Sequence, residues 1–165
     1  MIKVESLKEY KRILSKEDFE VLGNKIFMIT KYLVLEYSGY KRWYFEKQLK
    51  NIGSIEREIL FVRNKEKLDE IIAVACLKKT TLEKKICTLY VVENFRSMGI
   101  GSALINESFK FLGTTTPLIT FASYKLKLFK PFIKKYNWKL VQVIDKGYNN
   151  NFKELCFNGK LENHI

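Results

Sequence analysis

The sequence has little of what would bridge a small fold covalently or bind a metal ion. It holds two prolines, one histidine and three cysteines in 165 residues. Cys76, Cys87 and Cys156 lie far apart, are odd in number and form no CxxC pair. Neither a disulfide framework nor a metal site is therefore indicated. Free cysteines fit a reducing compartment, so we expect a cytoplasmic protein with no metal.

Long apolar runs are also lacking. The stretch Ile26–Leu35 contains a lysine and is far shorter than the ~20 residues that a membrane span needs. No apolar leader follows the charged N-terminus, so neither a membrane partner nor a secretory signal is expected. With 47% hydrophobic and 29% charged residues and no Gly/Ser linker, the composition is that of a soluble globular chain. We predict a single domain over residues 1–165.

Acidic residues are scarce relative to basic ones. The net charge is +12, and the excess is spread over both halves of the chain rather than gathered in a tail. Between Ser123 and Ile144 every charged residue is a lysine. One interpretation is a phosphate-rich partner such as coenzyme A, a nucleotide or RNA. The other is a lysine-rich surface that is simply solvated.

The apolar patterns predict a mixed α/β chain with helices on both faces of a sheet. Ser15 followed by Asp18 resembles a capping box, and apolar residues at helical spacing continue from there to a break at Ser38-Gly39. Further helices are predicted over 40–50, from the segment around Gly99 to Gly113, and over 130–136. Strands are predicted at 2–4, 58–62, 71–77, 86–92, 117–122, 140–144 and 152–157, the last two joined through Gly147 and residues 149–151. The run 71–77 is apolar throughout, which is typical of a central strand covered on both faces.

One segment has the pattern of an anion site. A buried strand ends near Val92, and Arg96-Ser97-Met98-Gly99-Ile100-Gly101 then opens a helix. The first N–H groups of a helix have no internal partner and carry the positive end of its dipole. Glycines allow a diphosphate to approach them closely, and an arginine adds a fixed charge. Glycines also open helices for packing reasons alone, so the hexapeptide by itself is weak evidence.

In its strand context the segment resembles the signature of the GCN5-related N-acetyltransferase (GNAT) superfamily, Q/R-x-x-G-x-G/A after a strand that ends in L-x-V. Leu89, Val91, Arg96, Gly99 and Gly101 match that signature residue by residue. The order of elements agrees from about residue 58 to 157. The resemblance implies a mixed, mostly antiparallel sheet of six to seven strands flanked by helices on both faces. It also implies transfer of an acetyl group from acetyl-coenzyme A to a primary amine.

The resemblance further implies where the substrates bind. Pantetheine would lie between strands 86–92 and 117–122, and the diphosphate would lie on backbone amides of the glycine segment. The residues expected to bind acetyl-coenzyme A are Leu89, Tyr90, Val91, Arg96, Ser97, Met98, Gly99, Ile100, Gly101 and Ser102. From charge alone, the lysines at 125, 127, 130 and 134 are placed near the 3′-phosphate. The thioester would point toward the two N-terminal helices, where Tyr37, Tyr40, Trp43 and Tyr44 are candidates for the acceptor wall. Ordinary packing of helices on the sheet is the alternative for these aromatic residues.

The family's usual acid is missing. The position where many relatives carry a tyrosine that protonates the leaving thiolate is Ile133 here. Tyr136, one helical turn later, and Tyr124, just before the helix, are candidate substitutes. For the general base we consider Glu58 acting through water, with Cys87 and His164 as weaker candidates. Catalysis by positioning alone, with water carrying the proton, stays open.

Two other functions remain alongside the small-molecule, peptide or protein amine acetyltransferase. The positive charge suggests an RNA-directed acetyltransferase, such as a toxin acting on aminoacyl-tRNA. The absent tyrosine suggests a non-catalytic module that binds coenzyme A or nucleic acid. We expect a monomer or a homodimer.

Overall fold

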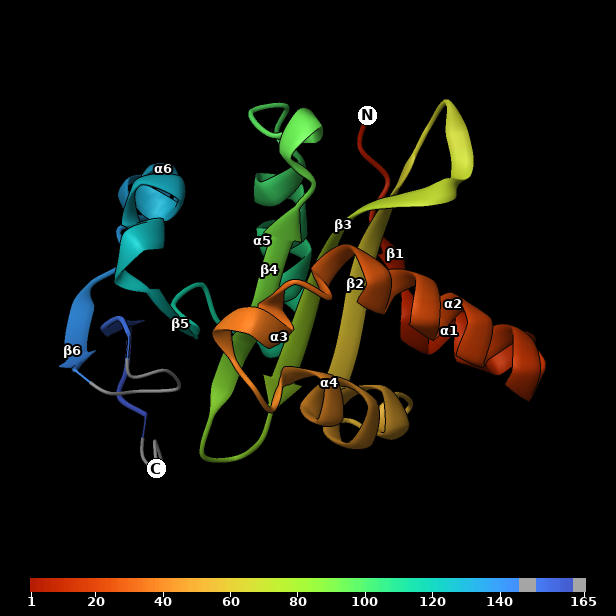
Figure 1. Cartoon of the computed structure of the whole chain (residues 1–165), viewed down its shortest axis with the longest axis horizontal. Coiled ribbons are helices and arrows are strands. Elements are labelled where there is room, and N and C mark those ends of the chain that lie inside the picture. Colours follow the sequence, from red (N-terminus) through yellow and green to blue (C-terminus); the bar gives the residue numbers. More distant parts are fainter. Residues whose placement is uncertain (146–150, 162–165) are drawn as a thin grey trace.

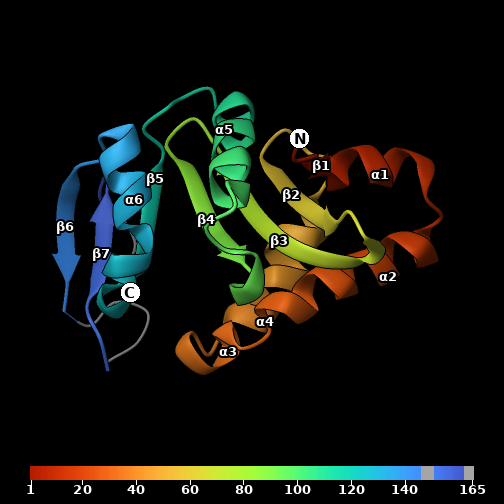
Figure 2. The ribbon, with the colours of Figure 1, turned by 90° about the horizontal axis from the view of Figure 1, so that it is seen from above.

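A seven-stranded sheet organises the chain in this computed structural model, which describes residues 1–145 and 151–161 (Figures 1 and 2). Across the sheet the strands are β1 (Glu5–Ser6), β2 (Arg57–Asn64), β3 (Lys67–Lys79), β4 (Lys84–Val91), β5 (Leu118–Ala122), β7 (Glu154–Phe157) and β6 (Leu140–Ile144). Strands β4 and β5 run parallel, and the other neighbouring pairs are antiparallel. The predicted mixed and mostly antiparallel sheet is confirmed.

Helices cover both faces of this sheet (Figure 2). On one face lie α5 (Ile100–Leu112) and α6 (Leu126–Tyr136). On the other lie α1 (Leu7–Ile13), α2 (Lys16–Thr30), α3 (Leu33–Glu36), α4 (Tyr40–Trp43) and the π-helical turn η1 (Tyr44–Gln48). Short 3₁₀ turns are η2 (Leu49–Asn51), η3 (Glu93–Phe95) and η4 (Ser123–Lys125). None of the helices in the described ranges combines the length and apolar character that crossing a bilayer requires.

Strand β3 separates two hydrophobic cores. Ala73, Ala75 and Leu77 face the core under α5 and α6, whereas Val74 and Cys76 face the core under α2 and α4. All five are at most 1% exposed, because alternate residues of a strand point to opposite faces and both faces are covered. The prediction of a central strand covered on both faces is confirmed.

The helix signals hold at some boundaries and fail at others. The Ser15 hydroxyl accepts the Asp18 amide at 3.1 Å and caps α2, as predicted. Gly113 ends α5 with φ +71°, as predicted. Helix α2 ends at Thr30 rather than at Ser38, because the chain turns at residues 31–32 before α3.

Three further elements differ from prediction. The first strand is β1 (Glu5–Ser6) rather than residues 2–4, and the short helix α1 that follows was not predicted. Its seven residues bury only Leu7 fully, which is too little for a helical period to show in the sequence. Helix α6 begins at Leu126, one turn earlier than predicted, because its apolar side already includes the buried Phe129. The predicted connection between β6 and β7 lies mostly outside the described residues.

The two parallel strands separate soon after they meet. Within the described strands, β4 pairs with β5 at Lys85 with Leu118 and at Ile86 with Ile119. On its other side, β4 has a bulge, since Leu77 pairs with Ile86 whereas Cys76 pairs with Thr88. Cys87 is therefore the extra residue, and it changes the direction of the strand at the point where β4 leaves β5.

Candidate functional site

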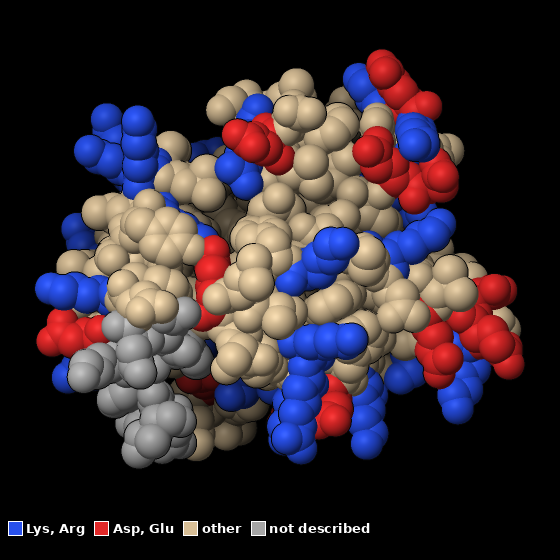
Figure 3. Space-filling view, viewed as in Figure 1, with Lys and Arg blue, Asp and Glu red and all other residues tan. Residues whose placement is uncertain are grey.

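Two adjoining hollows open where β4 and β5 separate. The first, of about 310 Å³, lies at the end of β4 against the start of α5 and against α6; we call it the glycine-loop hollow. The second, of about 500 Å³, lies between β4, β5, β7 and the helices α3 and α4; we call it the aromatic hollow. Leu89, Tyr90, Leu128 and Phe129 line both, so the two hollows adjoin, and we refer to the pair together as the channel. Figure 3 shows the surface hollowed beside α6 on this side of the molecule.

The glycine-loop hollow has the properties of an anion site. Helix α5 begins after Gly99, which adopts φ +83°, a left-handed conformation that favours glycine. Within the described chain no side chain caps this helix, and its first internal bond is donated by Ala103 to the Gly99 carbonyl. The preceding N–H groups are therefore available to an anion, and the helix dipole favours one there.

Most of the residues predicted to bind acetyl-coenzyme A line this hollow. They are Leu89, Tyr90, Val91, Arg96, Ser97, Gly99, Gly101 and Ser102. Met98 and Ile100 line neither hollow: Met98 is 62% exposed, and Ile100 is buried in the core under α5. Among the predicted lysines, Lys125 lines the aromatic hollow and forms an ion pair with Glu36 at 2.7 Å, whereas the others line neither hollow.

Arg96 and Gly101 have structural contacts of their own. The Arg96 Nε donates to the Val91 carbonyl at 2.8 Å, and its guanidinium lies 5.5 Å from the centre of the Tyr90 ring. A Cβ atom on Gly101 would lie 2.6 Å from Cζ of Phe132 on α6. A side chain at this position would require the Phe132 ring to move, so the glycine also has a packing role between α5 and α6.

Three of the four aromatic residues predicted for the acceptor side line the aromatic hollow: Tyr37, Tyr40 and Trp43. Tyr44 does not; it is fully buried and donates to the Gly23 carbonyl at 2.8 Å. For Tyr44 the packing interpretation holds. Tyr32, which the sequence did not single out, joins the wall with its ring 5.2 Å from that of Tyr90.

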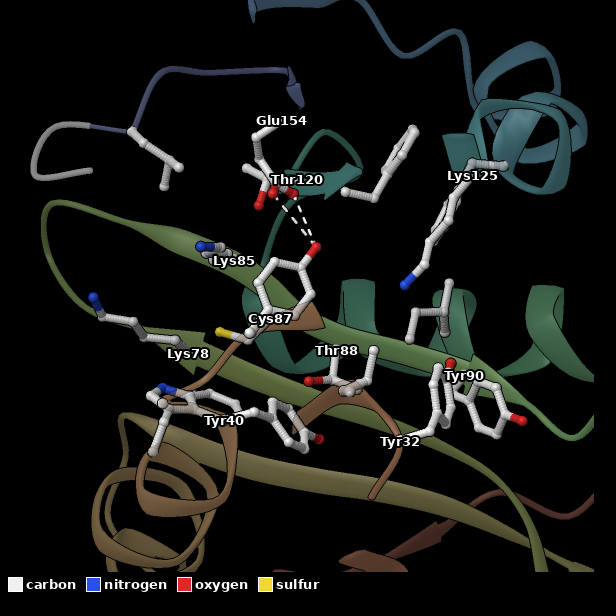
Figure 4. Close-up of a pocket in the computed structure, with 18 of the residues that line it drawn as sticks. Tyr32, Tyr40, Lys78, Lys85, Cys87, Thr88, Tyr90, Thr120, Lys125 and Glu154 are labelled. Carbon is white, nitrogen blue, oxygen red and sulfur yellow. Dashed lines mark hydrogen bonds between the residues drawn. The ribbon is translucent and has the colours of Figure 1, made fainter. Parts of the chain in front are cut away.

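A buried acid that the sequence analysis missed faces this hollow. Glu154 on β7 is 1% exposed, and the Tyr37 hydroxyl donates to its two carboxylate oxygens at 3.3 and 3.4 Å (Figure 4). Burial raises the pKa of Glu154 to about 7, although the Tyr37 hydrogen bond and the charges of Lys85 and Lys125 oppose the rise. A carboxylate with this pKa can accept a proton near neutral pH. The signal in the sequence was an acid at the start of the predicted closing strand, before the apolar Leu155.

Two predicted catalytic residues lie away from both hollows. Glu58 is buried under α1, where it accepts from the Ser6 hydroxyl at 2.7 Å and from the amides of Lys8 and Ile59. It therefore holds the start of α1. The Tyr136 hydroxyl donates to Asn106 on α5 at 3.1 Å. Tyr136 lies near the C-terminal end of α6, past the turns that line the channel, which is why the structure does not bring it there.

The remaining candidates differ in their distance from the channel. Tyr124 is 58% exposed and lies against Phe152, which Tyr37 also contacts, so one ring separates it from the wall of the aromatic hollow. Cys87 lines that hollow, but burial raises the pKa of its thiol, which makes it a poor base or nucleophile. His164 lies outside the described residues.

The charge is dispersed on the face that Figure 3 shows. Lysines and arginines are spread over the face, both at its edge and near its middle, and acidic residues lie among them. The lysines of α6 contribute to this pattern without forming a continuous band with the others on this face. This face therefore does not favour nucleic-acid binding over a generally lysine-rich surface.

Comparison with known proteins supplies a family and a fold. A family model described as "Acetyltransferase (GNAT) family" matches residues 26–115. A candidate GNAT acetyltransferase of Desulfovibrio desulfuricans has 10% identity and a TM-score of 0.56, over 95% of this chain and 97% of that one. A candidate streptothricin acetyltransferase of Bacillus anthracis, in complex with acetyl coenzyme A, has 16% identity and a TM-score of 0.55 over 66% of this chain.

A third similar structure is NAA60 of Arabidopsis thaliana in complex with acetyl-CoA, with 17% identity and a TM-score of 0.53 over 66% of this chain and 79% of that one. The chain spans 65% of the Bacillus anthracis protein, slightly less than two thirds. At these identities the likeness shows the fold. No curated protein matches the chain in sequence.

Proposed function

This chain belongs to the acetyltransferase (GNAT) family, and from that premise we propose that it transfers the acetyl group of acetyl-coenzyme A to a primary amine. The observation that carries the proposal is that the two hollows adjoin and share four lining residues. One end of the channel presents uncapped amides at the start of α5, and the other presents Glu154, a buried acid with a pKa of about 7. An anion site and a proton acceptor thus lie in adjoining hollows.

In this proposal acetyl-coenzyme A occupies the glycine-loop hollow. Its diphosphate accepts from the amides between Gly99 and Ser102, and its pantetheine runs along β4 at Leu89–Val91 between the separating strands. Two similar structures, those from Bacillus anthracis and Arabidopsis thaliana, are described as complexes with acetyl-CoA, which supports the assignment. The acetyl group then reaches the aromatic hollow where both hollows share Leu89 and Phe129.

The proposed chemistry is direct attack of the amine on the thioester. A primary ammonium group has a pKa of about 10 and must lose a proton before it can attack. Glu154 takes that proton, directly or through water, because it is largely ionised above pH 7. The nitrogen bonds to the carbonyl carbon and gives its second proton to water, the carbon–sulfur bond breaks, and the sulfur leaves as coenzyme A thiolate. No covalent intermediate with the enzyme forms.

For protonation of the thiolate we propose Tyr124 or solvent rather than Tyr136. Tyr124 stands at the end of β5, beside Lys125, which lines the aromatic hollow. Tyr136 instead contacts Phe109 and Asn106 of α5. One alternative function considered from sequence is a non-catalytic module, which has no use for a buried acid that can exchange a proton at neutral pH. We therefore favour turnover.

The binding half of the proposal is tested at Ser102, the third residue of α5, which lines the glycine-loop hollow. Ser102→Glu places a carboxylate at the diphosphate position, whereas the helix dipole keeps the fold stable. Ser102→Gln is the neutral control of similar size. Acetyl-coenzyme A and desulfo-coenzyme A, but not NAD, should raise the melting temperature of the wild type. We expect Ser102→Glu to bind acetyl-coenzyme A at least about tenfold more weakly than Ser102→Gln, a difference of ~1.4 kcal/mol. Equal affinities in the two variants would show that the diphosphate binds elsewhere.

A further inference from the structure

Three basic side chains lie side by side across the sheet at one end of the aromatic hollow. Arg57 of β2 pairs directly with Lys78 of β3, and Lys78 pairs directly with Lys85 of β4. Directly paired residues of neighbouring strands point to the same face, and all three line the hollow. We call them the basic row. Like charges in directly opposite positions destabilise a sheet; Glu83 pairs with Lys78 at 2.9 Å, and an anionic ligand against the row would lower the cost further.

The first member of the row is held in place by a buried side chain. Gln48, fully buried in the π-helical turn η1, accepts from Nη1 of Arg57 at 3.0 Å. The same side chain donates to the carbonyls of Glu58 and Leu77 at 2.8 and 3.2 Å, which fixes its amide to β2 and β3. A guanidinium oriented by a buried amide is arranged in advance for an anion, and π-helical turns occur frequently at functional sites.

The charges around the hollow leave an excess of positive charge at this end. Its charged lining residues are Arg57, Lys78, Glu83, Lys85, Lys125 and Glu154. Lys78 is paired with Glu83 at 2.9 Å, and Lys125 is paired with Glu36. Figure 4 shows Lys78 and Lys85 on one side of the pocket and Lys125 on the other. Of the six charged lining residues, four are basic and two are acidic, and three of the four basic ones form the basic row.

We infer that the acceptor is a primary amine that also carries an anionic group, a carboxylate or a phosphate, which binds against Arg57, Lys78 and Lys85. This inference rests on the proposed acetyl transfer, and it names the class of acceptor. The amine lies toward Glu154, where it loses its proton, and the anionic group lies toward the basic row. A polycation such as a polyamine or an aminoglycoside would bring further ammonium groups against that row, so acceptors of this kind are disfavoured.

The test compares acceptors in matched pairs that differ in the anionic group. One arm sets α-amino acids against their α-amides, and the other sets phosphoethanolamine against ethanolamine, with spermidine as a polycation. Initial rates are followed by release of the coenzyme A thiol, and acetyl-coenzyme A affinity is measured separately by calorimetry. For the preferred pair we expect kcat/KM to be at least about tenfold higher for the anionic member, since charge-assisted hydrogen bonds are typically worth that much.

Variants of the basic row then test whether its side chains cause the preference for the anionic acceptor. Arg57→Gln and Lys78→Gln should each lower the preference for the anionic member by about tenfold, through KM, while the neutral member is little changed. Lys84→Gln is the matched control, because Lys84 is exposed and precedes Lys85 on the same strand, so its side chain points to the opposite face. Equal acetyl-coenzyme A affinity in all variants shows that the fold and the other hollow are intact.

The outcomes separate this inference from the function on which it rests. If acetyl-coenzyme A does not bind the wild type, the proposed function fails. If it binds, but the neutral amines or spermidine are preferred, or no anionic amine is acetylated, the inference about the acceptor is overturned. A preference that survives unchanged in Arg57→Gln and Lys78→Gln also overturns it. Whether the carboxylate or the phosphate arm shows the preference identifies the anionic group.

Discussion

Replacing the buried acid of the aromatic hollow tests catalysis and stability with one substitution. Glu154→Gln keeps the shape of the side chain and an oxygen that can accept from Tyr37, but it cannot take up a proton. General base help is typically worth ~10²–10⁴-fold, so kcat/KM at pH 8 should fall by about that factor. In the wild type kcat/KM should rise with pH and level off above an apparent pKa of about 7, and the variant should lose this rise.

The same substitution should stabilise the fold at high pH. The folded pKa of Glu154 is raised from 4.5 to about 7, so the folded state binds the proton more tightly than the unfolded state. That contribution is fully present below the unfolded pKa of about 4.5 and is lost as the pH rises through about 7. At about 1.4 kcal/mol per pH unit, the interval corresponds to roughly 3 kcal/mol. Glu154→Gln should therefore unfold with a free energy up to ~3 kcal/mol above that of the wild type at pH 8, and with little difference at pH 4.

Denaturant unfolding and initial rates across pH 5–9 measure both effects. Glu58→Gln is a control, because Glu58 is also a buried carboxylate but lines neither hollow. It should lose stability, since three donors depend on its carboxylate, and keep the pH profile of the rate. If a folded Glu154→Gln protein keeps its rate within threefold and shows the same pH profile, Glu154 is not the base.

The remaining predictions concern tyrosines and the aromatic wall. If the Tyr124 hydroxyl supplies the thiolate proton, Tyr124→Phe should lower kcat by up to ~10²-fold without changing acetyl-coenzyme A affinity, whereas Tyr136→Phe should change kcat less than threefold. Rate measurements on both variants decide between Tyr124 and solvent as the proton donor. A large loss of kcat in Tyr136→Phe would refute the assignment made from the position of Tyr136. Tyr44→Phe should cost about 1 kcal/mol of unfolding free energy by removing the bond to Gly23 and leave the acceptor KM unchanged, whereas Trp43→Ala should raise that KM. Denaturant unfolding and steady-state kinetics on that pair distinguish core from wall, and a raised KM in Tyr44→Phe would contradict the packing role.

The sequence predicted best what depends on local patterns. The cap at Ser15, the end of α5 at Gly113 and the covered strand at 71–77 each follow from a few neighbouring residues. The glycine segment was recognised for the same reason, because the start of a helix and its free amides are a local feature. The short helix α1 was missed, since its single buried residue, Leu7, leaves no period to detect.

The chemistry of the aromatic hollow depends on the pairing register of the strands, which cannot be predicted from the sequence. The row of Arg57, Lys78 and Lys85 exists only because three strands pair at those residues. Glu154 becomes buried only because β7 inserts between β5 and β6, with the helix α3 region and Tyr37 above it. The Tyr136 prediction rested on its being one helical turn from Ile133, but a turn moves a side chain ~5.4 Å along the axis, here past the end of the channel.

The most direct test of the account is acetyl transfer itself. Purified protein would be incubated with acetyl-coenzyme A and a mixture of amino acids, phosphoethanolamine, polyamines, peptides, aminoglycosides and charged tRNA, with products identified by mass spectrometry. We predict that one class of amine gains the mass of a single acetyl group in step with release of coenzyme A, and that Ser102→Glu lowers both by about tenfold or more when acetyl-coenzyme A is below saturation. Binding of acetyl-coenzyme A with no acetylated amine in any class, at pH 8 and with substrate in excess, would contradict the account.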